Sequence, residues 1–126
     1  MPATANVVIA FVAALQACFL VLEMFLWQTP LGLRTFGLTP EFAAATRTLA
    51  ANQGLYNGFL AAGLAWGLCL GSKGTSVKVF FLLCVVVAGV YGAATADWKI
   101  LLIQAAPAVL GLGLLKVGEV PIRGQR

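Results

Sequence analysis

Three amides and a phenol, side chains that could bind a ligand by hydrogen bonds, lie close together within an apolar stretch. The segment 47–71 carries them in its first half, in A-N-Q-G-L-Y-N-G: Asn52, Gln53, Tyr56 and Asn57. On an α-helix, at about 100° per residue, they occupy one arc of roughly 140°. This arc cannot face lipid, because its polar groups would then lack partners. We expect it to face other protein or a wet cavity.

The composition predicts that the elements positioning these residues are membrane helices. Hydrophobic residues make up 61% of the 126-residue chain and charged residues 10%, against about 25% charged residues in soluble domains. The mean hydropathy is +0.97. We expect an all-α integral membrane four-helix bundle, a single domain over 1–126. Its predicted spans are about 5–27, 47–70, 77–96 and 98–117.

The connections between the spans carry local signals. Residues 28–46, with two prolines and two glycines, predict an ordered loop at the membrane interface. Within it, Thr39-Pro40-Glu41 predicts a helix start, with Thr39 as the N-cap and an acid at the positive end of the dipole. Asp97-Trp98-Lys99 predicts a tight hairpin that makes spans three and four antiparallel neighbours, and 118–126 reads as a short cationic tail.

The basic residues predict the orientation. Five fall on one side of the predicted membrane: Lys73, Lys78, Lys116, Arg123 and Arg126. Three fall on the other: Arg34, Arg47 and Lys99. Because cytoplasmic loops carry the excess of Lys and Arg, we expect both termini in the cytoplasm. The chain is expected to cross its membrane several times.

Small residues recur at the spacing by which membrane helices approach closely. Span two carries two such series, Gly54, Gly58 and Ala62, then Gly63, Gly67 and Gly71. Span three carries Ala88, Gly92 and Ala96, and span four carries Ala106, Gly111 and Gly113 around Pro107. These series favour a close bundle. Since span two has more polar and small-residue surface than one neighbour can cover, we also expect a homo-oligomer, a dimer or trimer.

Further polar residues are predicted to join the amides of span two. In alternating spans, Glu23 and the first half of span two fall in the extracytoplasmic half, and the other half is expected to be almost purely apolar. The candidate ligand-binding set is Glu23, Asn52, Gln53, Tyr56, Asn57 and Gln104. A secondary set is Gln16, Arg47, Tyr91 and Thr95. Gln16 and Glu23, seven residues apart, share nearly one helix face.

This cluster has a structural and a functional interpretation. In the first, the amides form interhelical hydrogen bonds worth about 0.6 kcal/mol each, and Glu23 either pairs with Arg47 near the interface or snorkels to the interface. In the second, the spans surround a pocket in which Glu23 carries a proton or anchors a ligand, since an intramembrane acid is costly and commonly functional.

Several kinds of chemistry are not predicted. The chain has no histidine and four acids, so no metal site can be assembled, and no cofactor is expected. Hydrolase and phosphate-loop motifs are absent from the sequence. The net charge of +4 forms no basic run that would bind nucleic acid. Cys18, Cys69 and Cys84 lie in apolar spans and are expected to act as small hydrophobes.

Three stretches resemble one family: E-M-F-L-W at 23–27, R-x-F-G-L at 34–38, and A-N-Q-G-L-Y-N-G-F-L at 51–60. They resemble domain-of-unknown-function family thirteen-zero-four, small four-span proteins of bacterial membranes. The resemblance covers nearly the whole chain. It implies a four-helix, multi-pass protein of the bacterial cytoplasmic (inner) membrane and no established activity.

The start of span two also resembles, more weakly, the second helix of the MAPEG family, trimeric four-span enzymes of eicosanoid and glutathione metabolism. Arg47, Asn52 and Gln53 before Phe59 carry this resemblance. The glutathione-binding members tend to show Arg, Asn four residues later and an acid three beyond. Here Asn52 follows Arg47 by five residues and Leu55 stands where the acid would be, so the resemblance implies the trimeric plan rather than glutathione binding.

Three hypotheses for function follow, and whether the protein is an enzyme stays open. The first is a binding or transport module for a small lipophilic molecule or a lipid in the extracytoplasmic half. The second is a MAPEG-like enzyme acting on lipophilic substrates, with Arg47 and Tyr56 as stabilising groups. The third is a structural or accessory subunit whose polar face meets a partner. Membrane lipids are partners in each.

Overall fold

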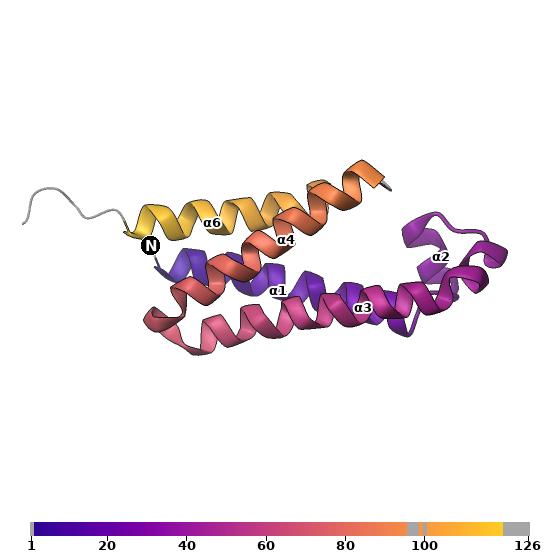
Figure 1. Ribbon diagram of the computed structural model, residues 1–126, viewed down its shortest axis with the longest axis horizontal. Helices are drawn as coiled ribbons and strands as arrows, with labels where there is room; N and C mark the ends of the chain where they lie inside the picture. Colours follow the sequence, from indigo (N-terminus) through magenta and orange to yellow (C-terminus); the bar gives the residue numbers. More distant parts are fainter. Residues whose placement is uncertain (1, 96–98, 100, 120–126) are drawn as a thin grey trace, which may run out of the picture. The chain divides into compact units, whose positions relative to one another are not determined.

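The computed structural model describes residues 2–95, 99 and 101–119, and it confirms the predicted all-α class over these residues (Figure 1). Short turns separate the helices, and no β-strand occurs in the described ranges. The elements are α1 (Pro2–Met24), α2 (Pro30–Phe36), α3 (Pro40–Cys69), the 3-10 helix η1 (Gly71–Gly74), α4 (Thr75–Thr95), the π-helical turn η2 (Leu101–Ala105) and α6 (Ala106–Glu119).

Two stretches of described helix are long and apolar enough to cross a membrane. They are Ala3–Met24, with a mean hydropathy of 2.4, and Gly71–Thr95, with 2.2. Leu102–Gly118 is a shorter apolar helix. The α3 helix is longer, at 30 residues, but the amides of its first half lower its hydropathy. A membrane location is therefore supported by two helices.

The chain forms two compact units. Residues 13–62 form one, called here the hairpin unit. Residues 1–12 and 63–126 form the other, called here the terminal unit. The α1 and α3 helices supply residues to both.

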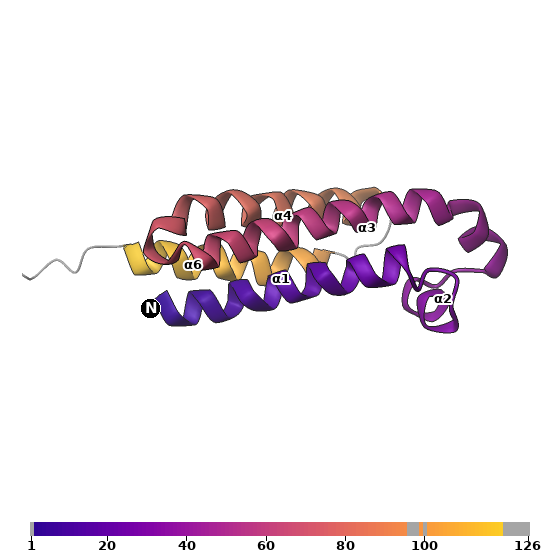
Figure 2. The same cartoon turned by 90° about the horizontal axis from the view of Figure 1, so that it is seen from below.

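In the hairpin unit, α1 and α3 run antiparallel and α2 lies in the connection between them (Figure 2). The loop predicted over 28–46 is wrong in this part, because residues 30–36 are helical. The Thr29 hydroxyl caps α2 by accepting from the Gly32 N–H at 3.3 Å. Gly37 ends it in the left-handed conformation, at φ 64°. Pro30, read as a loop breaker, instead sits in the first turn, where it needs no hydrogen-bond partner.

Aromatic contacts hold α2 to the end of α1. The Phe36 ring lies 4.9 Å from Trp27 and 6.5 Å from Phe19, measured between centroids. The Trp27 indole N–H donates to the Thr46 hydroxyl at 3.1 Å. These contacts order a segment whose prolines and glycines alone would not define it.

The helix start predicted at Thr39 is confirmed. The α3 helix begins at Pro40, and the Thr39 hydroxyl accepts from the Phe42 N–H at 3.2 Å. Glu41 lies in the first turn, at the positive end of the helix dipole. This start places Asn52 to Asn57 in the middle of one continuous helix.

Small residues of α3 allow it to approach α1, as predicted. A Cβ on Gly54 would lie 2.7 Å from Met24 Cγ and 3.1 Å from Glu23 Cβ. A Cβ on Gly58 would meet the Leu20 side chain. The Gly54–Gly58 series therefore brings the α3 backbone against the face of α1 that carries Glu23.

In the terminal unit, α4 and α6 lie side by side and run in opposite directions (Figure 1). The buried residues of α4 are Lys78, Leu82, Val85 and Gly89. Their spacing of four, three and four places them on one face of the helix. A Cβ on Gly89 would lie 3.0 Å from Ala105 Cβ. A close approach of α4 is therefore made at Gly89, and the approach predicted at Gly92 stays a prediction.

The last helix begins with an irregular turn. Residues 101–105 are π-helical and Pro107 follows two residues later. Proline has no N–H and clashes with the preceding turn, and a π-type turn is one way to accommodate that break. The hairpin predicted at Asp97-Trp98-Lys99 falls mostly on residues outside the described ones, as does nearly all of the predicted tail at 118–126.

Candidate functional site

A carboxylate–amide contact joins the two long helices of the hairpin unit. The Asn57 side-chain N–H donates to Glu23 Oε1 at 2.8 Å, and both residues are half-buried. Glu23 lies one residue before the end of α1, and Asn57 lies one turn along α3 from Gly54. Because Gly54 has no side chain, the α1 backbone comes close enough for Asn57 to reach the carboxylate. The sequence predicts that Glu23 and the amides of span two lie at one depth, and in the structure Asn57 is the amide that contacts the carboxylate.

Of the two structural alternatives for Glu23, the pairing with Arg47 is not formed. Arg47 is exposed, and no hydrogen bond or ion pair joins these two described residues. Helix geometry explains the outcome, since Arg47 lies ten residues before Asn57, or about 15 Å along α3 at 1.5 Å per residue. The only partner recorded for Glu23 in the described part of the chain is therefore a neutral amide.

Three other members of the candidate set on α3 lie at its surface. Asn52, Gln53 and Tyr56 are exposed. The Tyr56 ring packs on Phe59 of the same helix, at 6.0 Å between centroids. They form a polar face beside the Glu23–Asn57 contact, available to a ligand or to another protein chain.

Gln16 differs from these three because it is completely buried. Its exposed fraction is 0%, and neither of its side-chain polar atoms has a hydrogen-bond partner among the described residues. A buried polar group left without a partner costs about 1–3 kcal/mol. Gln16 and Glu23 lie nearly on one face of α1, about 10 Å apart along it at 1.5 Å per residue. The face that holds the acid thus also holds an unsatisfied amide.

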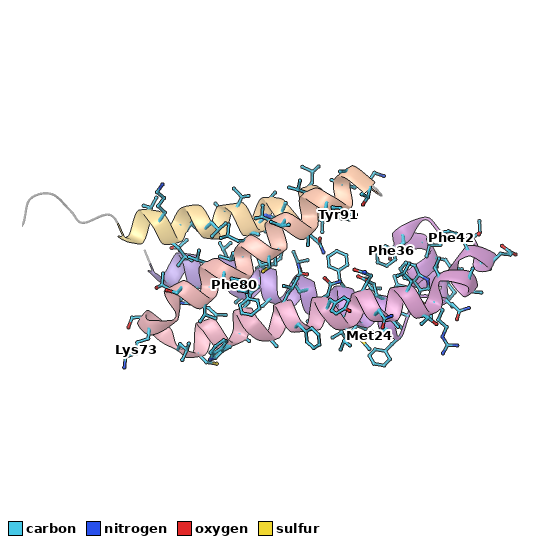
Figure 3. All side chains as sticks on the ribbon, viewed as in Figure 1. Met24, Phe36, Phe42, Lys73, Phe80 and Tyr91 are labelled. Atoms are coloured by element: carbon cyan, nitrogen blue, oxygen red, sulfur yellow. The ribbon has the colours of Figure 1, made fainter. Side chains whose placement is uncertain are left out.

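The other predicted site residues belong to the terminal unit. Tyr91 and Thr95 are exposed near the end of α4, and the Thr95 hydroxyl donates to the Tyr91 carbonyl at 2.7 Å. Tyr91, labelled in Figure 3, is 71% exposed. Gln104 is buried in η2, at 9% exposure. Their convergence with Glu23 stays a prediction.

A second polar contact, not predicted as a site, lies in the terminal unit. The Lys78 ammonium donates to Asn6 Oδ1 at 3.0 Å and to the Gly71 carbonyl at 3.3 Å. Lys78 is 4% exposed. The positive-inside argument counts it as a cation at the membrane surface, and the expected purely apolar half contains both Lys78 and Asn6. Without Lys78, the basic residues number four on one side and three on the other, instead of five and three.

Glycines make room for the buried lysine. A Cβ on Gly67 of α3 would lie 2.8 Å from Lys78 Cγ. A Cβ on Gly74 of η1 would collide with the Gly67 carbonyl. The sequence signal for this contact is a lysine one turn inside an apolar span, with glycines at 67, 71 and 74 on the preceding segment.

These two contacts differ in the chemistry that they offer. Glu23 presents a carboxylate with a neutral hydrogen-bond donor beside it, which suits a ligand with an ammonium or N–H group, or a proton. Lys78 presents an ammonium with neutral acceptors beside it, which suits an anion. Arg47 and Tyr56, the groups proposed for MAPEG-like catalysis, are both exposed and have no recorded contact with each other.

Comparison with known proteins places the chain among others of unassigned activity. A family described as "Protein of unknown function (DUF1304)" matches residues 10–116, a range that includes Glu23, Asn57 and Lys78. The "Uncharacterized protein YpaA" of Lactococcus lactis subsp. lactis (strain IL1403) is 28% identical over 110 residues, which are 85% of this chain and 92% of that protein. No solved structure matches the chain.

Proposed function

The chain belongs to the DUF1304 family, and from that premise we propose that it is a multi-pass protein of the bacterial cytoplasmic membrane. Two helices with the length and hydropathy of membrane spans support the location. The proposal assigns four spans, with both termini in the cytoplasm, on the remaining excess of basic residues on that side. The predicted homo-oligomer is part of the same proposal.

The proposed activity is the binding or transport of a small amphipathic molecule at the polar face of the hairpin unit. The observation that carries it is the Glu23–Asn57 hydrogen bond of 2.8 Å within two long helices of a largely apolar chain. An acid at membrane depth is costly and marks a ligand or proton pathway more often than a purely structural contact. Since Glu23 has a neutral partner, its charge would be matched by a cationic or N–H group of the ligand.

Two further observations support a ligand here. Gln16 keeps a buried, unsatisfied amide on the same face of α1, and a bound molecule or proton path would give it a partner. The exposed Asn52, Gln53 and Tyr56 extend the polar surface along α3. Asn57 would position the Glu23 carboxylate, and the exposed amides would select the ligand.

Ethidium, a fluorescent lipophilic cation with amino groups, tests this proposal. It would be titrated into the purified full-length protein in detergent, and binding followed by fluorescence. Glu23→Gln should weaken binding by about tenfold or more, because a hydrogen bond to a charged group contributes roughly 1.5–3 kcal/mol. Glu41→Gln is the matched control, since it removes the same charge from an exposed position in the first turn of α3.

Equal binding by the wild type and Glu23→Gln would overturn the proposed site. Equal weakening in Glu23→Gln and Glu41→Gln would also overturn it, because net charge alone would then explain the effect. Loss of assembly in Glu23→Gln, measured by light scattering, would favour the structural subunit of the third hypothesis. That alternative is favoured by the exposed polar face of α3, which a second copy could cover.

A further inference from the structure

The buried ammonium of Lys78 lines a cavity in the terminal unit that no part of the proposed function uses. The cavity has a volume of about 230 Å³. Its polar wall comes from Asn6, Ser72, Thr75 and Lys78, and its apolar wall includes Leu114 and Leu115 of α6. It is therefore amphipathic, with a buried positive charge on one side and leucines on the other.

The hydrogen bonds of Lys78 leave its charge unbalanced. An ammonium has three donors and no acceptor. Two of them go to Asn6 Oδ1 and the Gly71 carbonyl, which are neutral oxygens, and no carboxylate contacts Lys78 in the part of the chain that the structure describes. Removing such a charge from water costs several kcal/mol unless it is paired. An anion in the cavity would supply the pairing.

The contacts around Lys78 indicate a built site rather than an accident of packing. The aliphatic part of the Lys78 side chain occupies the space left by Gly67. A Cβ on Gly67 would lie 3.2 Å from the Lys78 backbone nitrogen. The Gly74 backbone in turn fits against the Gly67 carbonyl. Three segments of the chain, those around Asn6, Gly71 and Lys78, converge on one ammonium group.

All elements that line the cavity contribute a helix end. Ala5 and Asn6 lie near the start of α1, Ser72 lies in η1, and Thr75 and Lys78 lie in the first turns of α4. The residues from α6 come from its last turns. In a membrane-spanning arrangement, helix ends lie at the depth of the lipid headgroups. The exposed Lys116, in the last turn of α6, adds positive charge at these ends.

We infer that this cavity binds a phosphate group, with the Lys78 ammonium as its charge partner and the Ser72 and Thr75 hydroxyls as further donors. The phosphate would come from an anionic phospholipid headgroup or from a free phosphate ester. The volume lies below the roughly 300–1,000 Å³ of pockets for drug-sized ligands, so the cavity would hold the headgroup and leave any acyl chains outside, along the leucines. The lipid form rests on the membrane location proposed above, whereas the charge chemistry does not.

Lipid titration of the full-length protein in detergent tests this inference. The midpoint of thermal unfolding would be followed as phosphatidylglycerol, phosphatidylcholine or inorganic phosphate is added. The wild type should respond to phosphatidylglycerol, and Lys78→Met should bind it about tenfold or more weakly, since it loses a charge-assisted hydrogen bond. Lys73→Met, which removes an exposed lysine of η1, should bind as the wild type does.

A second pair of variants keeps the test valid if Lys78→Met does not fold. Ser72→Asp places a negative charge at the cavity, and Ser76→Asp places the same charge on the next exposed serine of the segment. Only Ser72→Asp should abolish the response. A response to inorganic phosphate as well would assign a free phosphate ester as the ligand, and a response to phosphatidylglycerol alone would assign the lipid.

Three results would overturn the inference. The first is that the wild type responds neither to phosphatidylglycerol nor to inorganic phosphate. The second is that Lys78→Met and Lys73→Met lose the response to phosphatidylglycerol equally. The third concerns Glu119, whose side chain lies outside the described structure and which follows the cavity residue Gly118. If phosphatidylglycerol binds only after Glu119→Gln, then the chain's own carboxylate is the partner of Lys78.

Discussion

The polar contacts of the two units each combine one charged side chain with one asparagine, yet they differ in burial and support. Glu23 and Asn57 in the hairpin unit are half-buried, and Gly54 beside them faces the flexible Met24 side chain. Lys78 in the terminal unit is 4% exposed, and the glycine contact beneath it is between backbones. A half-buried group supported by flexible neighbours can exchange its partner for a ligand. A buried group supported by backbone is fixed in place, so its partner must come to it.

Replacing a glycine beside each contact should give the largest difference in stability between the two units. Gly74→Ala is expected to destabilise the protein by about 3 kcal/mol, because the new Cβ meets the Gly67 backbone carbonyl, which cannot rotate away. Gly54→Ala should cost about 1 kcal/mol, since Met24 Cγ, 2.7 Å from the new Cβ, can move to another rotamer and the Leu20 carbonyl lies further away, at 3.2 Å. Thermal unfolding in detergent measures both. Equal costs would contradict the difference in rigidity.

The two asparagines give the next largest effect. Asn6→Ala should cost about 1–3 kcal/mol, because the buried Lys78 ammonium loses its acceptor at 3.0 Å. Asn57→Ala should cost about 0.6 kcal/mol, the average for interhelical hydrogen bonds in membranes, since the half-buried Glu23 can find another donor. Chemical unfolding of both variants against the wild type supplies the comparison. A larger cost at Asn57 would reverse the assignment of the rigid and the exchangeable contact.

Gln16→Leu should give the smallest change in stability, and with the opposite sign. Leucine removes two buried polar atoms that have no partner among the described residues, so the variant should be more stable by about 1 kcal/mol. The same variant should bind ethidium more weakly if the amide serves the ligand. A destabilised variant would show that Gln16 has a structural partner. Thermal unfolding and ethidium titration of one preparation measure both effects.

Much of the fold followed from local sequence patterns. The Thr39-Pro40-Glu41 start and the glycine series of α3 are short-range signals, and both were confirmed. The α2 helix was not predicted, although Thr29, Pro30 and Gly37 are local start and stop signals, because a helix of seven residues also needs the packing of Phe36 against Trp27 and Phe19. Of the candidate site, the sequence indicated that Glu23 lies near the amides of span two, but it did not single out Asn57, and the pairing with Arg47 is not formed. Helical arcs define which residues share a face, but not which of them reaches a given carboxylate.

The Lys78 contact shows the main limit of reading charges as topology signals. A lysine near the end of a span is usually a surface cation. Here the absence of a side chain on Gly67 lets the Lys78 stem turn inward, and Asn6, seventy-two residues away in sequence, supplies the acceptor. No local sequence pattern indicates that Lys78 and Asn6 contact each other. The opposite chemistry of the two contacts could therefore be described only once the structure had placed their partners.

The central claim is that Glu23 and Lys78 serve ligands of opposite charge, and one cross-comparison tests it most directly. Ethidium and phosphatidylglycerol would each be titrated into the wild type, Glu23→Gln and Lys78→Met. Glu23→Gln should bind ethidium about tenfold or more weakly and keep its response to phosphatidylglycerol, and Lys78→Met should do the reverse. If both variants lose both responses, or neither variant loses either, the two contacts are not separate binding sites and the account is contradicted.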